Sequence, residues 1–203
     1  MAPSGAAAAW NALVLDDDPF LQHAFLAGLE THGCVGPGTH WQPLPLTVVD
    51  DDGRWLGACP LYLKTDSWGE FVFDWGWADA YHRNGLRYYP KLVAAVPHTP
   101  ATGQRLLLAP DADRAAVAAL LADGARALAA ELGCSSLHVL FPQAGELAAL
   151  RTAGLTPRLG CQFHWHDRGY RDFDDFLDAF AAKKRKNLRQ ERRRVREAGI
   201  ELE

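Results

Sequence analysis

Two short apolar runs on either side of a helical pattern constrain the fold of this chain more than any other feature. Residues 92–96 form an apolar run that ends at Pro97, and residues 137–141 form a second, broken only by one histidine, that ends at Pro142. Between them, residues 114–132 place apolar side chains three and four positions apart, which makes one face of a helix apolar. These side chains are Val117, Leu120, Leu121, Ala125, Leu128 and Leu132. The sequence therefore predicts two buried parallel strands joined by a right-handed helical crossover.

The flanking segments predict the rest of an α/β domain. In chain order they are a helix at 19–33, a hairpin of 46–49 and 54–64, a short helix at 144–153 and a strand at 156–166. Pro60 stands inside the second hairpin strand and indicates an edge or a bulge there. The loop 98–105 leaves the carboxyl end of the first central strand, which is where ligands bind in open α/β sheets.

Residues 68–91 are rich in aromatic rings that stand beside carboxylates and glycines. Flat rings shape a cleft while a carboxylate supplies a base or a counter-charge for an amine, so this composition is typical of a pocket wall. The residues that we assign to substrate binding are Glu70, Trp75, Trp77, Tyr88, Tyr89 and Lys91. The alternative is that the rings belong to the core, because aromatic side chains dominate cores as well as sites.

Positive charge is concentrated near the carboxyl-terminal end. The net charge is -4, but residues 183–203 hold nine Lys/Arg and four Glu, which sum to +5 and leave -9 for residues 1–182. An apolar stripe predicts one amphipathic helix over residues 173–198. Its cationic residues include Lys183, Lys184, Arg185, Lys186 and Arg189. Such a face is either solvated or in contact with the phosphates of a nucleic acid or cofactor. Residues 200–203 then predict the start of another strand, so we expect a truncated chain.

The spacing of cysteine and histidine argues against a metal site or a disulfide framework. The four cysteines are isolated, without a C-x-x-C pair, so we expect single thiols. His164 and His166 would share one face of a strand, but no third ligand lies nearby in the sequence, and so we expect no metal. The first ten residues lack a basic region, and no apolar run approaches the ~20 residues that span a bilayer. We therefore expect a cytoplasmic protein.

Several short motifs follow one another in an order that resembles one known family. They are Gly69-Glu70-x-Val72-Phe73-Asp74, Trp77-Ala78-Asp79-Ala80, Tyr88-Tyr89-Pro90-Lys91-Leu92, Thr99-Pro100-x-x-Gly103-x-Arg105, Gln162-Phe163-His164-Trp165 and Lys184-Arg185-Lys186-Asn187. The set is similar to the FemAB-like family of predicted N-acyltransferases, described as peptidoglycan biosynthesis or recognition proteins. The resemblance implies the GNAT acyltransferase fold, in which helices flank a mixed central sheet, followed by a long basic helix. It also implies a first GNAT-like domain at 1–170 and the opening of a second, truncated one at 171–203.

The resemblance also implies a chemistry, in which an amine attacks an acyl carbonyl directly. Asp74, Asp79 or His164 would accept the proton. The phosphates of the acyl donor would lie on the loop and on the helix that follows it. The donor-binding residues are Thr99, Gly103, Gln104 and Arg105.

The identity of the donor stays open between acyl-coenzyme A and aminoacyl-tRNA, and no covalently bound cofactor is expected. Asp111 and Asp113 stand at the start of the central helix, where carboxylates would repel a pyrophosphate. This counts against coenzyme A in this part of the chain. The acceptor would be a small molecule or a cell-wall precursor that carries an amine.

Two other functions remain open at this level. A non-catalytic module would recognise a glycan or peptide through residues 68–89. A nucleic-acid-binding protein, with tRNA as the natural partner, would use residues 183–196 and would lose affinity steeply as salt rises.

Overall fold

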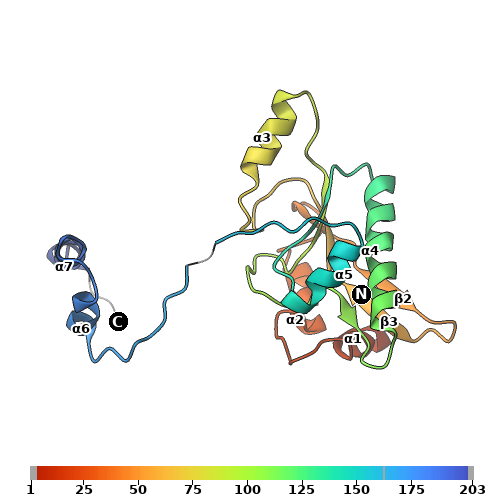
Figure 1. The fold of residues 1–203 in the computed structure, drawn as a ribbon, viewed down its shortest axis with the longest axis horizontal. Coiled ribbons are helices and arrows are strands. Elements are labelled where there is room, and N and C mark those ends of the chain that lie inside the picture. Colours follow the sequence, from red (N-terminus) through yellow and green to blue (C-terminus); the bar gives the residue numbers. More distant parts are fainter. Residues whose placement is uncertain (1–3, 162, 201–203) are drawn as a thin grey trace. The chain divides into compact units, whose positions relative to one another are not determined.

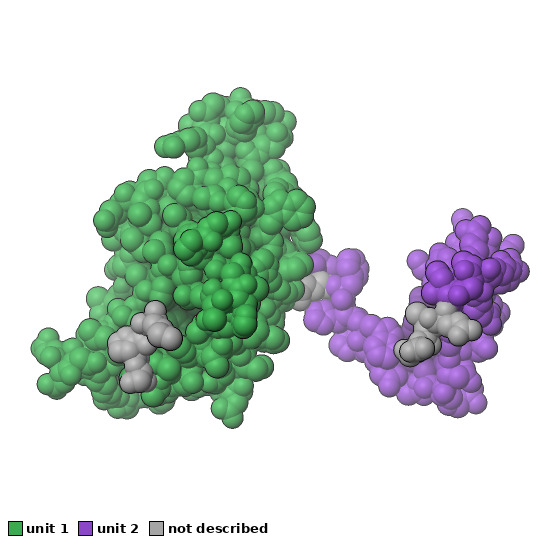
Figure 2. Space-filling view, turned by 180° about the vertical axis from the view of Figure 1, so that it is seen from behind, with its two compact units in different colours: residues 1–159 green, residues 160–203 purple. Residues whose placement is uncertain are grey.

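The computed structural model describes residues 4–161 and 163–200 (Figure 1). The chain divides into two compact units, unit 1 at residues 1–159 and unit 2 at residues 160–203 (Figure 2). The predicted mixed α/β fold is confirmed, since helices accompany one four-stranded and one three-stranded sheet. That residues 171–203 open a second GNAT-like domain stays a prediction.

The central strand–helix–strand unit is confirmed, but the prediction that both strands are buried was wrong for the second, which is half-buried at the edge of its sheet. Strands β5 (Lys91–Ala94) and β7 (Leu137–Val139) pair in parallel, with Leu92 opposite Leu137 and Val93 opposite His138. The sheet order is β1 (Trp41–Pro43), β4 (Leu61–Lys64), β5 and β7, so β5 lies in the interior and all four of its residues are buried. The connection between β5 and β7 contains α4 (Arg114–Glu131), the longest helix of the described chain (Figure 1).

Helix α4 packs against the core mainly through valine and alanine side chains, with Leu121 as its one buried leucine. Its buried residues are Val117, Ala118, Leu121, Ala122, Ala125 and Ala129. Leu120 is 58% exposed and Leu132 39% exposed, so the predicted face was wrong at these two positions. The helix approaches the sheet closely at Gly57, where an added Cβ would stand 2.5 Å from Val117 Cγ1.

Pro60 divides the second strand of the predicted hairpin between two sheets. Strand β3 (Trp55–Cys59) pairs with β2 (Leu46–Val49) and with β6 (Leu107–Leu108) in the three-stranded sheet. Strand β4 (Leu61–Lys64) pairs instead with β1 (Trp41–Pro43) and β5. Proline has no N–H for a ladder, and its carbonyl accepts a hydrogen bond from Ala95 N at 3.1 Å. The prediction of one continuous strand was therefore wrong, although the irregularity was placed correctly.

Two helices precede the first strand, α1 (Ser4–Asn11) and α2 (His23–Thr31). Helix α2 begins four residues later than predicted, because Asp18 Oδ1 accepts from Phe20 N and closes a turn instead of a helical cap. The predicted short helix after β7 is confirmed as η1 (Ala144–Glu146) and α5 (Leu147–Thr152).

Unit 2 departs most from the predicted elements. The described residues between 156 and 166 form no strand, and no described strand pairs with this segment, so that prediction was wrong. The side chains of Leu159, at the end of unit 1, and of Phe163 are 95% and 99% exposed. The single predicted helix was also wrong. It is two helices, α6 (Phe173–Asp178) and α7 (Ala182–Glu197), because Ala181 is extended, with φ -57° and ψ 148°. The strand predicted from residue 200 falls mainly on residues 201–203, which lie outside the described residues.

Candidate functional site

The segment between β4 and α3 (Trp75–Arg83) points aromatic rings outward and carboxylates inward. Trp68 and Phe73 are 71% and 74% exposed, whereas Glu70 and Asp74 are 2% and 1% exposed. Phe71 and Phe73 reach this arrangement with positive φ angles of 60° and 50°, a region that phenylalanine rarely adopts. One stretch of chain therefore builds an exposed aromatic surface and a buried acidic site.

Lys91 is the centre of the buried site. As the first residue of β5 it is fully buried, and its Nζ lies 2.8 Å from Glu70 Oε2, 2.5 Å from Asp74 Oδ2 and 2.9 Å from Ser67 Oγ. An ammonium has three N–H donors, so these three partners use all of them. We call Ser67, Glu70, Asp74, Tyr88, Lys91 and His138 the Lys91 cluster.

Two tyrosines enclose the ammonium. Tyr88 OH donates to Asp74 Oδ2 at 2.6 Å, and Tyr89 OH shares a hydrogen bond with Ser67 Oγ at 2.8 Å. The Lys91 Nζ lies 5.2 Å and 5.7 Å from the centroids of the two tyrosine rings, within the range of a cation–π contact. The rings thus stabilise the same charge that the carboxylates neutralise.

Burial and pairing move the pKa values of the cluster in different directions. Burial would raise the pKa of Asp74, but hydrogen bonds from Lys91 and Tyr88 outweigh it and lower that pKa to about 2. Burial raises the pKa of Glu70, and Lys91 opposes this only in part. Burial, helped by the charge of Lys91, lowers the pKa of His138 to about 4, so this imidazole is neutral at pH 7.

One oxygen of each buried carboxylate has no partner. Glu70 Oε1 and Asp74 Oδ1 are buried and accept no hydrogen bond in the described part of the chain. His138 Nδ1 lies 4.0 Å from Asp74 Oδ2. Glu70, Asp74 and His138 each offer one ligand atom, and these atoms lie within 4.8 Å of one another. In the described residues, this is the group whose geometry could hold a metal ion.

The structure brings some of the predicted site residues together and leaves others apart. Of the predicted residues, Glu70, Asp74, Tyr88, Tyr89 and Lys91 meet in or around the Lys91 cluster. Trp75, Trp77 and Asp79 lie on α3, which projects from the rest of unit 1 and was not predicted to be a helix (Figure 1). Asp79 is exposed and pairs with Arg83, at 3.2 Å.

His164 belongs to unit 2 and is described within that unit alone. Its ring lies nearly parallel to the ring of His166, with centroids 6.3 Å apart and an interplanar angle of 18°. The two rings therefore share a side, as predicted, without being in a strand.

Ser67 and His138 were missed by the sequence reasoning. His138 is the polar residue in the apolar run of β7, and its register opposite Val93 places it on the same face of the sheet as Lys91. Lys64 lies opposite Lys91 and is also fully buried, with its Nζ 2.8 Å from Asp66 Oδ1. Polar residues inside otherwise apolar strands were the signal that could have identified this face.

The predicted donor-binding loop is held by internal hydrogen bonds. Gly103 N donates to Phe141 O at 3.1 Å, and Arg105 N donates to Glu146 Oε1 at 2.7 Å. The Arg105 guanidinium is 1% exposed and donates to the carbonyls of Leu140, Gln104 and Ala101, each at 2.7 Å. Gln104 Oε1 accepts from Leu15 N, and Thr99 Oγ1 donates to Pro97 O. The donor-binding role of these residues stays a prediction.

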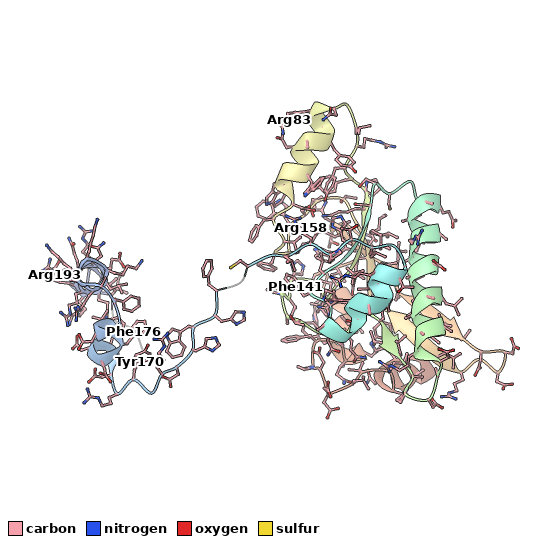
Figure 3. The ribbon with its side chains drawn as sticks, in the orientation of Figure 1. Arg83, Phe141, Arg158, Tyr170, Phe176 and Arg193 are labelled. Carbon is pink, nitrogen blue, oxygen red and sulfur yellow. The ribbon has the colours of Figure 1, made fainter. Side chains whose placement is uncertain are left out.

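In unit 2, helix α6 engages one face of the basic helix α7. Arg185 lies 2.6 Å from Asp178, Arg189 lies 3.4 Å from Asp174, and the guanidinium of Arg192 lies 3.9 Å from the centroid of the Phe173 ring. Side chains radiate from the remaining faces of α7, among them Arg193 (Figure 3). Lys183, Lys186 and Arg194 follow one another along a single face, and none forms an ion pair with another described residue. Helix α7 thus presents a cationic stripe that unit 2 itself does not neutralise.

Comparison with solved structures found two that are similar to this chain. Two solved structures that resemble the chain are aminoglycoside antibiotic 6'-N-acetyltransferases, AAC(6')-Ih from Acinetobacter baumannii and AAC(6')-IG from Acinetobacter haemolyticus. The first has 13% identity and a TM-score of 0.47 over 82% of this chain and 92% of that one. The second has 14% identity and a TM-score of 0.48 over 82% of this chain and 95% of that one. No curated protein matches the chain.

Helices that could cross a membrane are absent from the described part of the chain. The model of the FemAB-like family, described as peptidoglycan biosynthesis/recognition, matches residues 4–203. Because this match spans nearly the whole sequence and includes the residues of the Lys91 cluster, the chain belongs to the FemAB-like family.

Proposed function

We propose that the protein is an N-acyltransferase that transfers an acyl or aminoacyl group to an amine of a peptidoglycan precursor or a similar acceptor, in the cytoplasm. The observation that carries the proposal is the family match over residues 4–203. The family description gives the context of peptidoglycan, and the resemblance of the motifs gives the class of reaction.

The choice of acyl donor rests on the N-terminus of helix α4, where the backbone N–H groups already have partners. A helix N-terminus binds phosphate through its free N–H groups, but Asp113 Oδ1 already accepts from Ala115 N and Ala116 N, both at 3.1 Å. The amides of Gly103 and Arg105 are also occupied within the protein. These contacts disfavour coenzyme A at this position, and we propose aminoacyl-tRNA as the donor.

The cationic stripe of α7 supports the same donor. Lys183, Lys186 and Arg194 are exposed on one helical face, which also carries the exposed Asn187 and the half-buried Gln190. Contacts between such a stripe and phosphates release counterions, so the affinity for tRNA falls linearly with the logarithm of the salt concentration.

The acceptor amine is proposed to lie against α3. Trp75 and Asp79 are four residues apart on this helix and therefore share a face. A ring and an exposed carboxylate side by side suit an amine, which the carboxylate attracts and deprotonates. Of the three predicted bases, Asp74 is held by Lys91 and Tyr88 with a pKa of about 2, which makes it a poor proton acceptor.

The test is a transfer assay with the full chain. The donors are tRNA charged with radiolabelled amino acids and, separately, labelled acetyl-coenzyme A; the acceptor is a peptidoglycan precursor peptide with a free amine. We expect label to pass from the charged tRNA, and Asp79→Asn to abolish transfer while Asp51→Asn, in the exposed hairpin turn, does not. Transfer from acetyl-coenzyme A alone would overturn the assignment of the donor, and transfer from neither would overturn the activity.

A second function is favoured by the exposed rings of Trp68, Phe71, Phe73, Trp75 and Trp77. A non-catalytic module would use them to bind a glycan or peptide, since apolar patches of this kind mark interaction sites. This function predicts binding of the precursor peptide without turnover from any donor, and Trp77→Ala would weaken that binding.

A further inference from the structure

The two buried carboxylates of the Lys91 cluster are each held by one oxygen and left open at the other. Lys91 binds Glu70 Oε2 and Asp74 Oδ2, and Tyr88 adds a second hydrogen bond to Asp74 Oδ2. Glu70 Oε1 and Asp74 Oδ1 are buried and unpartnered. Carboxylates that ligate a metal ion are oriented in the same way, by hydrogen bonds to the oxygens that do not bind the metal.

The charge of the cluster is not balanced by its own residues. Two carboxylates face one ammonium, and the side chains of Glu70, Asp74 and Lys91 are all 0% exposed. The other buried ammonium nearby, that of Lys64, is paired with Asp66 at 2.8 Å. An excess negative charge at a buried site is costly unless it is paired or coordinates a metal. A further cation would supply the missing charge.

His138 supplies a third ligand of a different type. Its side chain is 23% exposed, and no hydrogen bond of its ring to another described residue is seen. A neutral imidazole ring has a nitrogen lone pair that binds metal ions. Ligands at about 2.1 Å from one ion lie about 3 to 4 Å apart, so a group within 4.8 Å needs only small shifts to close on an ion.

We propose that Glu70, Asp74 and His138 bind one divalent transition-metal ion, with Lys91 and Tyr88 orienting the two carboxylates. Two carboxylates and one imidazole suit ions such as Mn²⁺ and Zn²⁺, whereas a site for Ca²⁺ would need six to eight oxygens. The ion would tie the segment 67–74 to strand β7. The proposal is independent of the acyl-transfer reaction.

The test uses Mn²⁺ added to the full chain after treatment with a chelator, and reads the loss of the electron paramagnetic resonance signal of free Mn²⁺. Mn²⁺ avoids the exposed thiols of Cys34 and Cys161, because thiolates select softer metals. We expect one ion per chain and a higher Tm in its presence. Glu70→Gln and His138→Asn should each weaken binding at least about tenfold, since even the partners that orient ligands are worth 10- to 100-fold.

The double variant His164→Ala/His166→Ala is the matched control, because those two rings lie side by side in unit 2 and offer a competing site. We expect it to bind Mn²⁺ as the unaltered chain does. His138→Asn guards against loss of folding, since it removes no described hydrogen bond; its Tm without metal should equal that of the unaltered chain. Absence of binding, or binding lost only in the control variant, would overturn the proposal and would mean that a proton on Glu70 balances the charge.

Discussion

The Lys91 cluster and the helix pair α6–α7 use charge in opposite ways. In the cluster, one ammonium and two carboxylates are fully buried, and each has a partner at 2.5 to 2.8 Å. In α6–α7, the ion pairs between Arg185 and Asp178 and between Arg189 and Asp174 have side chains that are 31% to 80% exposed. Water and salt screen the second set but not the first. Few buried charges therefore hold the site together, whereas many exposed charges are available for a partner.

Lys91→Met tests how much the buried charges of the Lys91 cluster contribute to stability. It leaves two buried carboxylates without their counter-charge, and we expect a loss of about 3 to 5 kcal/mol in the free energy of unfolding. Urea denaturation measures this loss. Lys183→Met on α7 is the control, and a surface change of this kind should stay within about 0.5 kcal/mol. Equal effects of the two substitutions would show that the burial of Lys91 does not matter.

Tyr88→Phe tests whether a hydrogen bond to a charged group contributes more to the stability of the cluster than a bond between neutral groups. The variant removes a bond to the charged Asp74 and should cost about 1.5 to 3 kcal/mol. Tyr89→Phe removes a bond between two neutral hydroxyl groups, those of Tyr89 and Ser67, and should cost about 0.5 to 1.5 kcal/mol. Both values come from the same denaturation experiment, and the reverse order would contradict the assignment of charge to Asp74.

Asp113→Ala tests an exposed carboxylate that belongs to neither region. It removes the cap of α4, and we expect a loss of about 1 kcal/mol. The same variant frees two N–H groups at the N-terminus of this helix. If the capping carboxylate excludes coenzyme A, binding of coenzyme A measured by calorimetry should improve in the variant; unchanged binding would separate the cap from donor selection.

Asp178→Asn removes an exposed ion pair of α6–α7, and we expect it to have the smallest effect on the free energy of unfolding. Pairs of this exposure contribute about 0.2 to 1 kcal/mol and are screened by salt. We expect the difference in stability between the variant and the unaltered chain to shrink as sodium chloride rises from low to high concentration. A difference that does not depend on salt would mean that Arg185 and Asp178 are shielded from solvent.

The central unit could be predicted because its signals are local. The apolar runs around residues 92 and 137 and the helical pattern between them define β5, α4 and β7 without knowledge of the rest of the chain. The predicted strand at 156–166 was wrong because no described strand pairs with this segment. Alternation in the sequence does not show whether a partner strand exists. The predicted helix over 173–198 was wrong because the extended conformation of one alanine leaves no mark in the sequence.

The candidate site was predicted in part for the same reason. Glu70, Asp74, Tyr88, Tyr89 and Lys91 lie within one aromatic-rich stretch, so composition brought them together. His138 lies 47 residues beyond Lys91 in number, and only the parallel register of β5 and β7 places it on the same face. The hydrogen bonds that occupy the backbone N–H groups of Gly103 and Arg105 could not be predicted, because their acceptors, Phe141 and Glu146, come from a later part of the chain.

Residues 68–75 combine two sets of side chains that can change independently, one exposed and one buried. Substitutions at Trp68, Phe71, Phe73 and Trp75 would change only the outer surface, while Glu70 and Asp74 keep the inner contacts with Lys91. A new binding preference could thus evolve by exchanging outward rings one at a time, without a loss of stability at each step. The same segment offers protein engineers a place to graft recognition onto an unchanged interior.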